Sequence, residues 1–193
     1  MTQYTIGAEV TCRGGVCGDL RRMVIDPVAR VLTHLVVEPK HREGEGRLVP
    51  VDLVDEVAEE ISLRCSAAEF DALEHAEEKS FLSPVGAVGM DDMGMSSIPQ
   101  VIFDDRVPAG EVEVSRGEPV HATDGNIGRV HGLVIDPKDH HVTHVLLGEG
   151  HLWGKKEIAI PIGAVKDVTA YGVRLNVTRD EVRDMPPVDL ANH

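Results

Sequence analysis

Short stretches in which apolar and polar residues alternate, separated by glycine-containing turns, run through most of this 193-residue chain. Residues 7–37 and 117–147 both follow this pattern, and each contains an Asp-Pro turn. A period of two is typical of half-buried β-strands, while glycine and Asp-Pro are typical of the turns between them. The pattern predicts a mainly β protein with five or six short strands in each of two units.

The two units are copies of one another. A shift of 110 positions aligns residues 7–37 with residues 117–147, and ten positions are identical, among them the run Val24-Ile25-Asp26-Pro27 against Val134-Ile135-Asp136-Pro137. The correspondence continues from Leu48–Val51 to Ala159–Ile162. Because Asp26 and Asp136 both precede proline, we expect their side chains to cap the turn. The chain therefore carries an internal duplication.

Each unit ends with the signature of a helix start. Ser66 with Glu69, and Thr178 with Glu181, fit the capping box, in which a hydroxyl and a carboxylate satisfy the amide groups of the first turn. We expect the first helix to run to about Lys79 and the second to be cut short by Pro186 and Pro187.

A sheet of about 70 residues usually closes into a barrel, which removes its open edges. We therefore expect two small six-stranded β-barrels, each followed by a short helix, over residues 4–83 and 111–190. Residues 84–110 contain several Gly, Met and Asp residues and are predicted to form a mobile linker. Methionine packs adaptably, so the Met-rich part of this linker is also a candidate for contact with a partner.

The repeated pattern resembles the PRC-barrel family. The residues that carry the resemblance are Gly18-Asp-Leu and Gly128-Arg-Val, VIDPVARVLTHLVV and VIDPKDHHVTHVLL, and LVPVDLV and IAIPIGAV. The family includes the cytoplasmic domain of the photosynthetic reaction-centre H subunit and is similar to the C-terminal domain of a ribosome-maturation factor. The resemblance implies six-stranded barrels that dock against other proteins, and it supplies no catalytic motif.

Composition narrows the range of partners. With 19 Lys and Arg against 33 Asp and Glu, the net charge of -14 repels phosphate, and aromatic residues make up only 3% of the chain. Direct nucleic-acid binding is therefore not expected. The N-terminal residues show no secretory signal, and no apolar stretch approaches the length of a transmembrane segment, so we expect a cytoplasmic protein.

Cys12 and Cys17 frame the turn residues Arg13-Gly14-Gly15-Val16, which could place them opposite each other across a hairpin. A redox pair is geometrically feasible there. In a reducing compartment, however, the simpler interpretation is two small buried apolar side chains.

Three histidines form the only candidate metal site, His140, His144 and His151. His140 and His144 would share one strand face, and His151 would join them if the chain folds back. Since His141 and His144 are three residues apart in a β-strand, they face opposite sides and do not form a zinc-protease motif. No nucleophile elbow or complete phosphate loop is present, so we predict neither an enzyme nor a cofactor.

His34 and His144 occupy the same place in the two repeats, on a strand with two largely apolar faces. One face should fill the barrel, and the other should be covered by the helix, the sister barrel or a second chain. We hypothesise that the two strands pack about a pseudo-two-fold axis and bring His34 near His144. The alternative is one histidine hydrogen-bonded within each barrel. The candidate interface residues are His34, Leu35, Val37, His144, Val145, Leu147 and the single tryptophan, Trp153.

The sequence thus favours a non-enzymatic protein-binding adaptor or assembly module, with a partner of unknown identity or a second copy in a homodimer. A metal- or pH-responsive module is a second hypothesis, based on the ten histidines. A ribosome-associated assembly factor is a third, suggested by the family resemblance alone.

Overall fold

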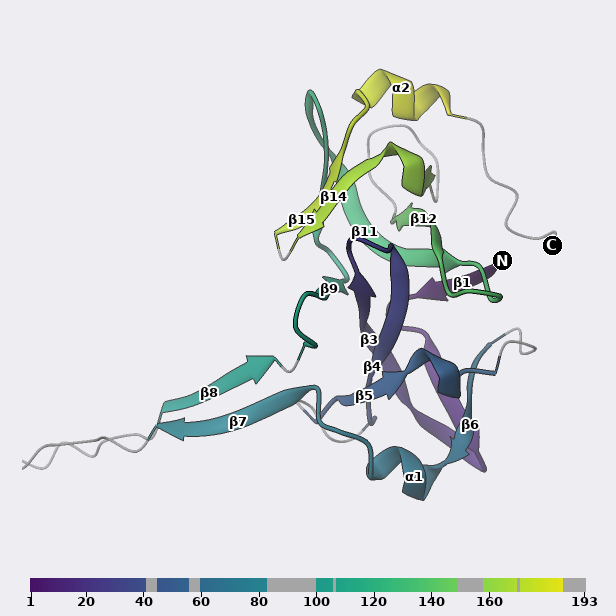
Figure 1. Cartoon of the computed structure of the whole chain (residues 1–193), viewed down its shortest axis with the longest axis vertical. Coiled ribbons are helices and arrows are strands. Elements are labelled where there is room, and N and C mark those ends of the chain that lie inside the picture. The colour runs from purple at the N-terminus through teal and green to yellow at the C-terminus, as the bar shows by residue number, and fades with distance from the viewer. Residues whose placement is uncertain are drawn as a thin grey trace, which may run out of the picture.

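The computed structural model describes residues 1–40, 45–55, 60–82, 100–105, 107–148, 158–169 and 171–185. These residues form two β-barrel-like units, one above the other in Figure 1, each with a short helix. The expectation of a mainly β fold with two such units is confirmed.

The first unit is a six-stranded sheet with the order β5-β4-β3-β2-β6, in which β9 also pairs with β3. Its strands are β2 (Glu9–Arg13), β3 (Gly15–Asp26), β4 (Val31–Glu38), β5 (Arg47–Pro50), β6 (Ile61–Ser66) and β9 (Val112–Ser115). A 3-10 turn, η1 (Val51–Leu53), follows β5, and Val54 then bridges to Leu63 of β6. The turn thus brings the two ends of the strand order back together.

The second unit is a seven-stranded sheet with the order β13-β12-β11-β10-β15-β14, in which β1 also pairs with β11. Its strands are β1 (Thr2–Thr5), β10 (Pro119–Ala122), β11 (Gly125–Ile135), β12 (Val142–Leu147), β13 (Ile158–Pro161), β14 (Val165–Thr169) and β15 (Gly172–Leu175). The turn η2 (Ile162–Ala164) joins β13 directly to β14, so the two end strands of the order are consecutive in the chain.

Each unit receives a strand from the other repeat. Strand β1 precedes the first repeat but pairs with β11, with Thr2 opposite Ile135. Strand β9 precedes the second repeat but pairs with β3, with Val112 opposite Ile25. These registers are identical after the shift of 110 positions, so the exchange is reciprocal. One hydrophobic core cluster accordingly contains residues from both units.

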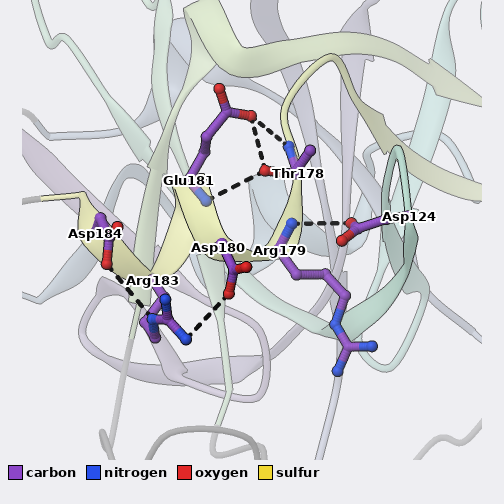
Figure 2. Close-up of polar contacts among 7 residues, drawn as sticks. All are labelled: Asp124, Thr178, Arg179, Asp180, Glu181, Arg183 and Asp184. Carbon is purple, nitrogen blue, oxygen red and sulfur yellow. Dashed lines mark hydrogen bonds and ion pairs between the residues drawn. The ribbon is translucent and has the colours of Figure 1, made fainter.

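Both predicted capping boxes are present. In α1 (Ala67–Asp71) Ser66 and Glu69 exchange the two capping hydrogen bonds, and in α2 (Arg179–Asp184) Thr178 and Glu181 do the same. Figure 2 shows the second box, beside which the Arg179 amide donates to Asp124 Oδ1 at 2.9 Å. Helix α2 ends before Pro186, as predicted. No helix in the described part of the chain has the length and apolar character needed to cross a membrane.

The expectation that the first helix continues to Lys79 is wrong. Helix α1 ends at Asp71, and residues 77–82 form a strand. The cause is tertiary, because the open edge of β5 offers backbone groups that need partners. The Leu48 amide donates to Glu74 O and the Ala76 amide donates to Gly46 O, each at 2.8 Å. Residues 74–76 therefore extend along β5 and do not continue the helix.

The predicted linker is partly a strand. Strand β7 (Glu77–Leu82) pairs antiparallel with β8 (Gln100–Asp105) in a separate two-stranded sheet. The Gly-, Asp- and Met-containing stretch up to residue 99 lies outside the described residues. Figure 1 shows that β7 and β8 extend away from both units.

Candidate functional site

The two units meet at a seam formed by the starts of β4 and β12. Val31 pairs with His141 in an isolated antiparallel bridge. On either side, the Leu32 amide donates to His140 O at 2.9 Å and the Val142 amide donates to Arg30 O at 2.8 Å. Because Val31 and His141 occupy the same repeat position, a pseudo-two-fold axis passes through this bridge.

The hypothesis that His34 lies near His144 is wrong. The strands do meet about a pseudo-two-fold axis, but only at their first residues. From the Val31–His141 bridge, the antiparallel register carries His34 and His144 in opposite directions, roughly 3.3 Å per residue. The two histidines therefore belong to separate environments, one in each unit.

Two residues at the seam adopt the left-handed conformation, and each reaches the opposite unit. Arg30 and His140 both have φ of 57°, a region that non-glycine residues seldom occupy. The Arg30 guanidinium donates to the Ile162 and Val165 carbonyls around η2, each at 3.1 Å. His140 Nε2 lies 3.7 Å from Asp52 Oδ1 in η1. The same repeat position thus brings a side chain of each unit to the 3-10 turn of the other, with hydrogen bonds in the case of Arg30.

The Asp-Pro turns lie directly before Arg30 and His140. Their aspartates cap the turns, as predicted. Asp26 Oδ1 accepts hydrogen bonds from the amides of Val28 and Ala29 at 2.8 and 2.9 Å. Asp136 Oδ1 accepts a hydrogen bond from the Lys138 amide at 3.0 Å.

His34 has a carboxylate neighbour from the segment that precedes β9. Its Nδ1 atom lies 3.0 Å from Thr33 Oγ1 and 3.7 Å from Glu111 Oε2. The Thr33 hydroxyl is 2.5 Å from the same carboxylate oxygen. The side chains of His34 and Glu111 are 24% and 18% exposed, so this contact is partly shielded from water.

Among the described residues, no carboxylate pairs with His144, although it occupies the same repeat position. Its Nδ1 atom lies 3.1 Å from Thr143 Oγ1. Where the first unit has Glu111, the second has Met1, whose sulfur lies 4.0 Å from the Thr143 hydroxyl. Burial lowers the pKa of His144, because desolvation disfavours the imidazolium form. In each unit the histidine Nδ1 atom thus lies within hydrogen-bond distance of the neighbouring threonine hydroxyl.

The three candidate metal ligands are not brought together. His140 lies in the turn before β12 with a positive φ, so it does not share a strand face with His144, and it is directed toward Asp52 of the first unit. His151 lies outside the described residues. Among the residues that the structure describes, no group of three His, Cys, Asp or Glu side chains is close enough to hold a metal ion.

The apolar residues of the predicted interface are buried in the hydrophobic core. Leu35, Val37, Val145 and Leu147 are at most 1% exposed and belong to the shared core cluster. Trp153 lies outside the described residues. The four aliphatic side chains therefore pack within this chain in the structure.

The hairpin of β7 and β8 is held to the first unit by Arg22, a residue that sequence reasoning missed. Arg22 Nη2 lies 2.6 Å from Glu77 Oε1, and its Nη1 atom lies 3.1 Å from Glu113 Oε2 of β9. All three side chains are at most 20% exposed. One available signal was that the second repeat has Gly132 at the position of Arg22. Another was the run Val101-Ile102-Phe103, which is typical of a strand.

Among the hollows of the described surface, one lies beside the hairpin and another in the second unit. The smaller, about 220 Å³, adjoins the hairpin base and is lined by Arg21, Arg22, Val36, Glu38, Gly46 and Glu77. The larger, about 540 Å³, lies in the second unit and is lined by His121, Ala122, Thr123, Lys166, Arg174, Leu175 and Asn176. Arg174 is engaged by both carboxylate oxygens of Asp167, at 2.7 and 2.9 Å.

Comparison with known families finds a match for one part of the chain. The family model of the PRC-barrel domain matches residues 116–183, which contain β10 to β15 and most of α2. The match covers the second repeat only. None of the curated proteins matches the chain.

Proposed function

We propose that this chain is a tandem PRC-barrel protein of the cytoplasm that binds another protein and catalyses no reaction, with the β7–β8 hairpin as its docking element. The carrying observation is that this hairpin forms a sheet of its own, apart from both units. The PRC-barrel match over residues 116–183 supports the family assignment of the second repeat. The equal registers of β1 and β9 support extending it to the first repeat.

An isolated two-stranded hairpin is marginally stable in water, and a third strand or a packing surface usually stabilises it. Among the described residues, neither β7 nor β8 pairs with any third strand. Their outer edges therefore offer unpaired backbone donors and acceptors to an extended segment of a partner. Addition of such a strand would supply main-chain hydrogen bonds, and the side-chain pockets would supply specificity.

Charge indicates the chemistry of the partner segment. At the base of the hairpin, Glu77 stands opposite Asp105 and Glu78 opposite Asp104. Like charges directly opposite each other destabilise a strand pair. We expect a partner strand with Lys or Arg residues at this end to complement these acidic positions.

The register of β7 and β8 suggests an experiment in which the hairpin is removed. Because Glu77 and Asp105 are cross-strand partners, the residues between them can be replaced by a two-residue Asn-Gly turn without moving the ends. We expect the excised chain to keep a thermal midpoint within a few degrees of the native value, and to lose its partner.

Partner contact is measured by photo-crosslinking in the native cell, with the crosslinking amino acid at Lys79 or Ser80. The control position is Tyr171, which is 89% exposed in the β14–β15 turn. Discrete crosslinked bands from the hairpin positions and none from Tyr171 support the proposal. A band at twice the chain mass would identify the partner as a second copy. Identical bands from all positions, or no bands from the hairpin, would count against it.

A further inference from the structure

Cys12 and Cys17 lie side by side at the tip of the β2–β3 hairpin. Their Cα atoms are 5.8 Å apart, within the range that disulfides span, and their sulfur atoms are in bonding contact. Cys12 pairs with Gly15, and the register shifts between Val10 and Thr11, so Cys17 lies within a β-bulge. Gly14 and Gly15, with φ of 110° and 147°, permit the tight turn.

The second repeat shows that the fold does not need sulfur at these positions. Ala122 and Ile127 stand where the first repeat has Cys12 and Cys17, and they are 7% and 2% exposed in the core. The hairpin around them has the same register and the same bulge. The second repeat therefore forms this hairpin without a disulfide, so breaking a bond between Cys12 and Cys17 need not unfold the unit.

The two cysteines differ in their exposure to solvent. The turn residue Val16 is 47% exposed and Cys17 is half-buried, while Cys12 is only 7% exposed. An incoming thiol or disulfide therefore meets the sulfur of Cys17 first. The third cysteine, Cys65, is a free thiol and is 6% exposed in the core. Burial raises the pKa of Cys65, which keeps it in the unreactive thiol form.

We propose that Cys12 and Cys17 form a reversible thiol–disulfide site that exchanges with small disulfides of the glutathione class. The Cys17 thiolate attacks the small disulfide, forms a mixed disulfide and releases one small thiolate. The Cys12 thiolate then attacks the Cys17 sulfur and releases the second. In total, the protein dithiol loses two electrons and two protons, and one small disulfide becomes two small thiols.

The test uses the full chain, reduced and then equilibrated without oxygen in glutathione buffers of graded ratio. After an acid quench, free thiols are labelled with a maleimide and counted by intact mass. We expect the count to fall from three to one in a single step as the buffer becomes more oxidising, with Cys65 the labelled residue. Loss of no thiols at the most oxidising ratio, or equal loss at all three cysteines, would overturn the proposal.

The second repeat supplies matched control variants. Cys12→Ala and Cys17→Ile copy Ala122 and Ile127, and each should leave one reactive thiol that forms at most a mixed disulfide with glutathione. Cys65→Val copies Val177 and should leave the two-thiol step at the same glutathione ratio. The double variant Cys12→Ala/Cys17→Ile should keep the native circular dichroism spectrum. If either single variant still loses two thiols together, the assignment to Cys12 and Cys17 is wrong.

Discussion

Val31 and His141 occupy the same position in the two repeats, and they pair with each other. Around this bridge the backbone hydrogen bonds, the left-handed residues and the exchanged strands are all duplicated. The chain therefore resembles a fused dimer, in which each unit is completed by a strand from the other repeat.

Strand exchange predicts that the two repeats stay together when the chain is cut. A specific protease site inserted between Leu82 and Gln100 should allow cleavage without separation, because β1 and β9 each hold the other half. Size-exclusion chromatography of the cleaved protein should show one peak of full-length size. Two smaller peaks would contradict the exchange.

A matched variant tests the contribution of β1. Tyr4 is 4% exposed in the shared core. In Tyr4→Asp an uncompensated carboxylate would be buried there, which is strongly unfavourable. After the same cleavage, we expect this variant to separate into its two halves.

Arg30 offers a test of the seam. Arg30→Ala should lower the free energy of unfolding by about 2 kcal/mol, because two hydrogen bonds from the guanidinium to η2 are lost. Arg30→Gly should cost only about 1 kcal/mol, since glycine removes the cost of the positive φ. Urea denaturation measures both values. Equal losses would show that the backbone conformation at Arg30 carries no strain.

The surroundings of Glu118 predict that the substitution Glu118→Gln stabilises the protein. Its Oε1 atom accepts from the Ser115 amide at 2.8 Å, whereas its Oε2 atom is buried without a hydrogen-bond partner. Burial raises the pKa of this carboxyl group. The favourable contribution of the protonated form is therefore complete below the unfolded-state pKa and is lost as the pH rises through the folded-state value.

Glu118→Gln should consequently unfold less readily than the native chain at pH 7, by up to about 1 kcal/mol, because the side chain keeps some contact with water. The advantage should shrink toward pH 4. Glu118→Ala, which copies Ala8 of the first repeat, is the control that loses the bond to Ser115. If the stability difference between Glu118→Gln and the native chain does not change with pH, ionisation of Glu118 is not its cause.

The burial of His144 predicts that the protein loses stability in acid. Burial lowers its pKa, so the folded state binds its proton less readily than the unfolded state does. Stability is therefore unaffected well above the unfolded-state pKa and falls as the pH drops through that value and toward the folded one. His144→Asn retains a polar atom near Thr143 but does not titrate. Relative to this variant, the native chain should lose stability between pH 7 and pH 5, by less than about 1 kcal/mol. Parallel unfolding curves at both pH values would refute the prediction.

The local features of this protein were predictable from short stretches of sequence. The turn aspartates Asp26 and Asp136 and the two capping boxes act through residues at most four positions away, so their patterns suffice. The strands of the repeated units followed from alternation for the same reason. The β7 strand did not, because residues 74–76 leave the helical path only to satisfy the edge of β5.

The sequence alone does not predict the long-range strand pairing, because the duplication makes two alternative pairings look alike. Val24-Ile25 and Val134-Ile135 offer equivalent edges to β1, and only the three-dimensional arrangement selects the second. The same holds for Arg30 and His140, whose partners lie in the opposite unit. By itself, the sequence determined the elements and their repetition, since these depend on near neighbours. The tertiary structure decided which repeat completes which, because that choice depends on strand pairs such as Thr2 with Ile135 and Ile25 with Val112, whose partners are far apart in the sequence.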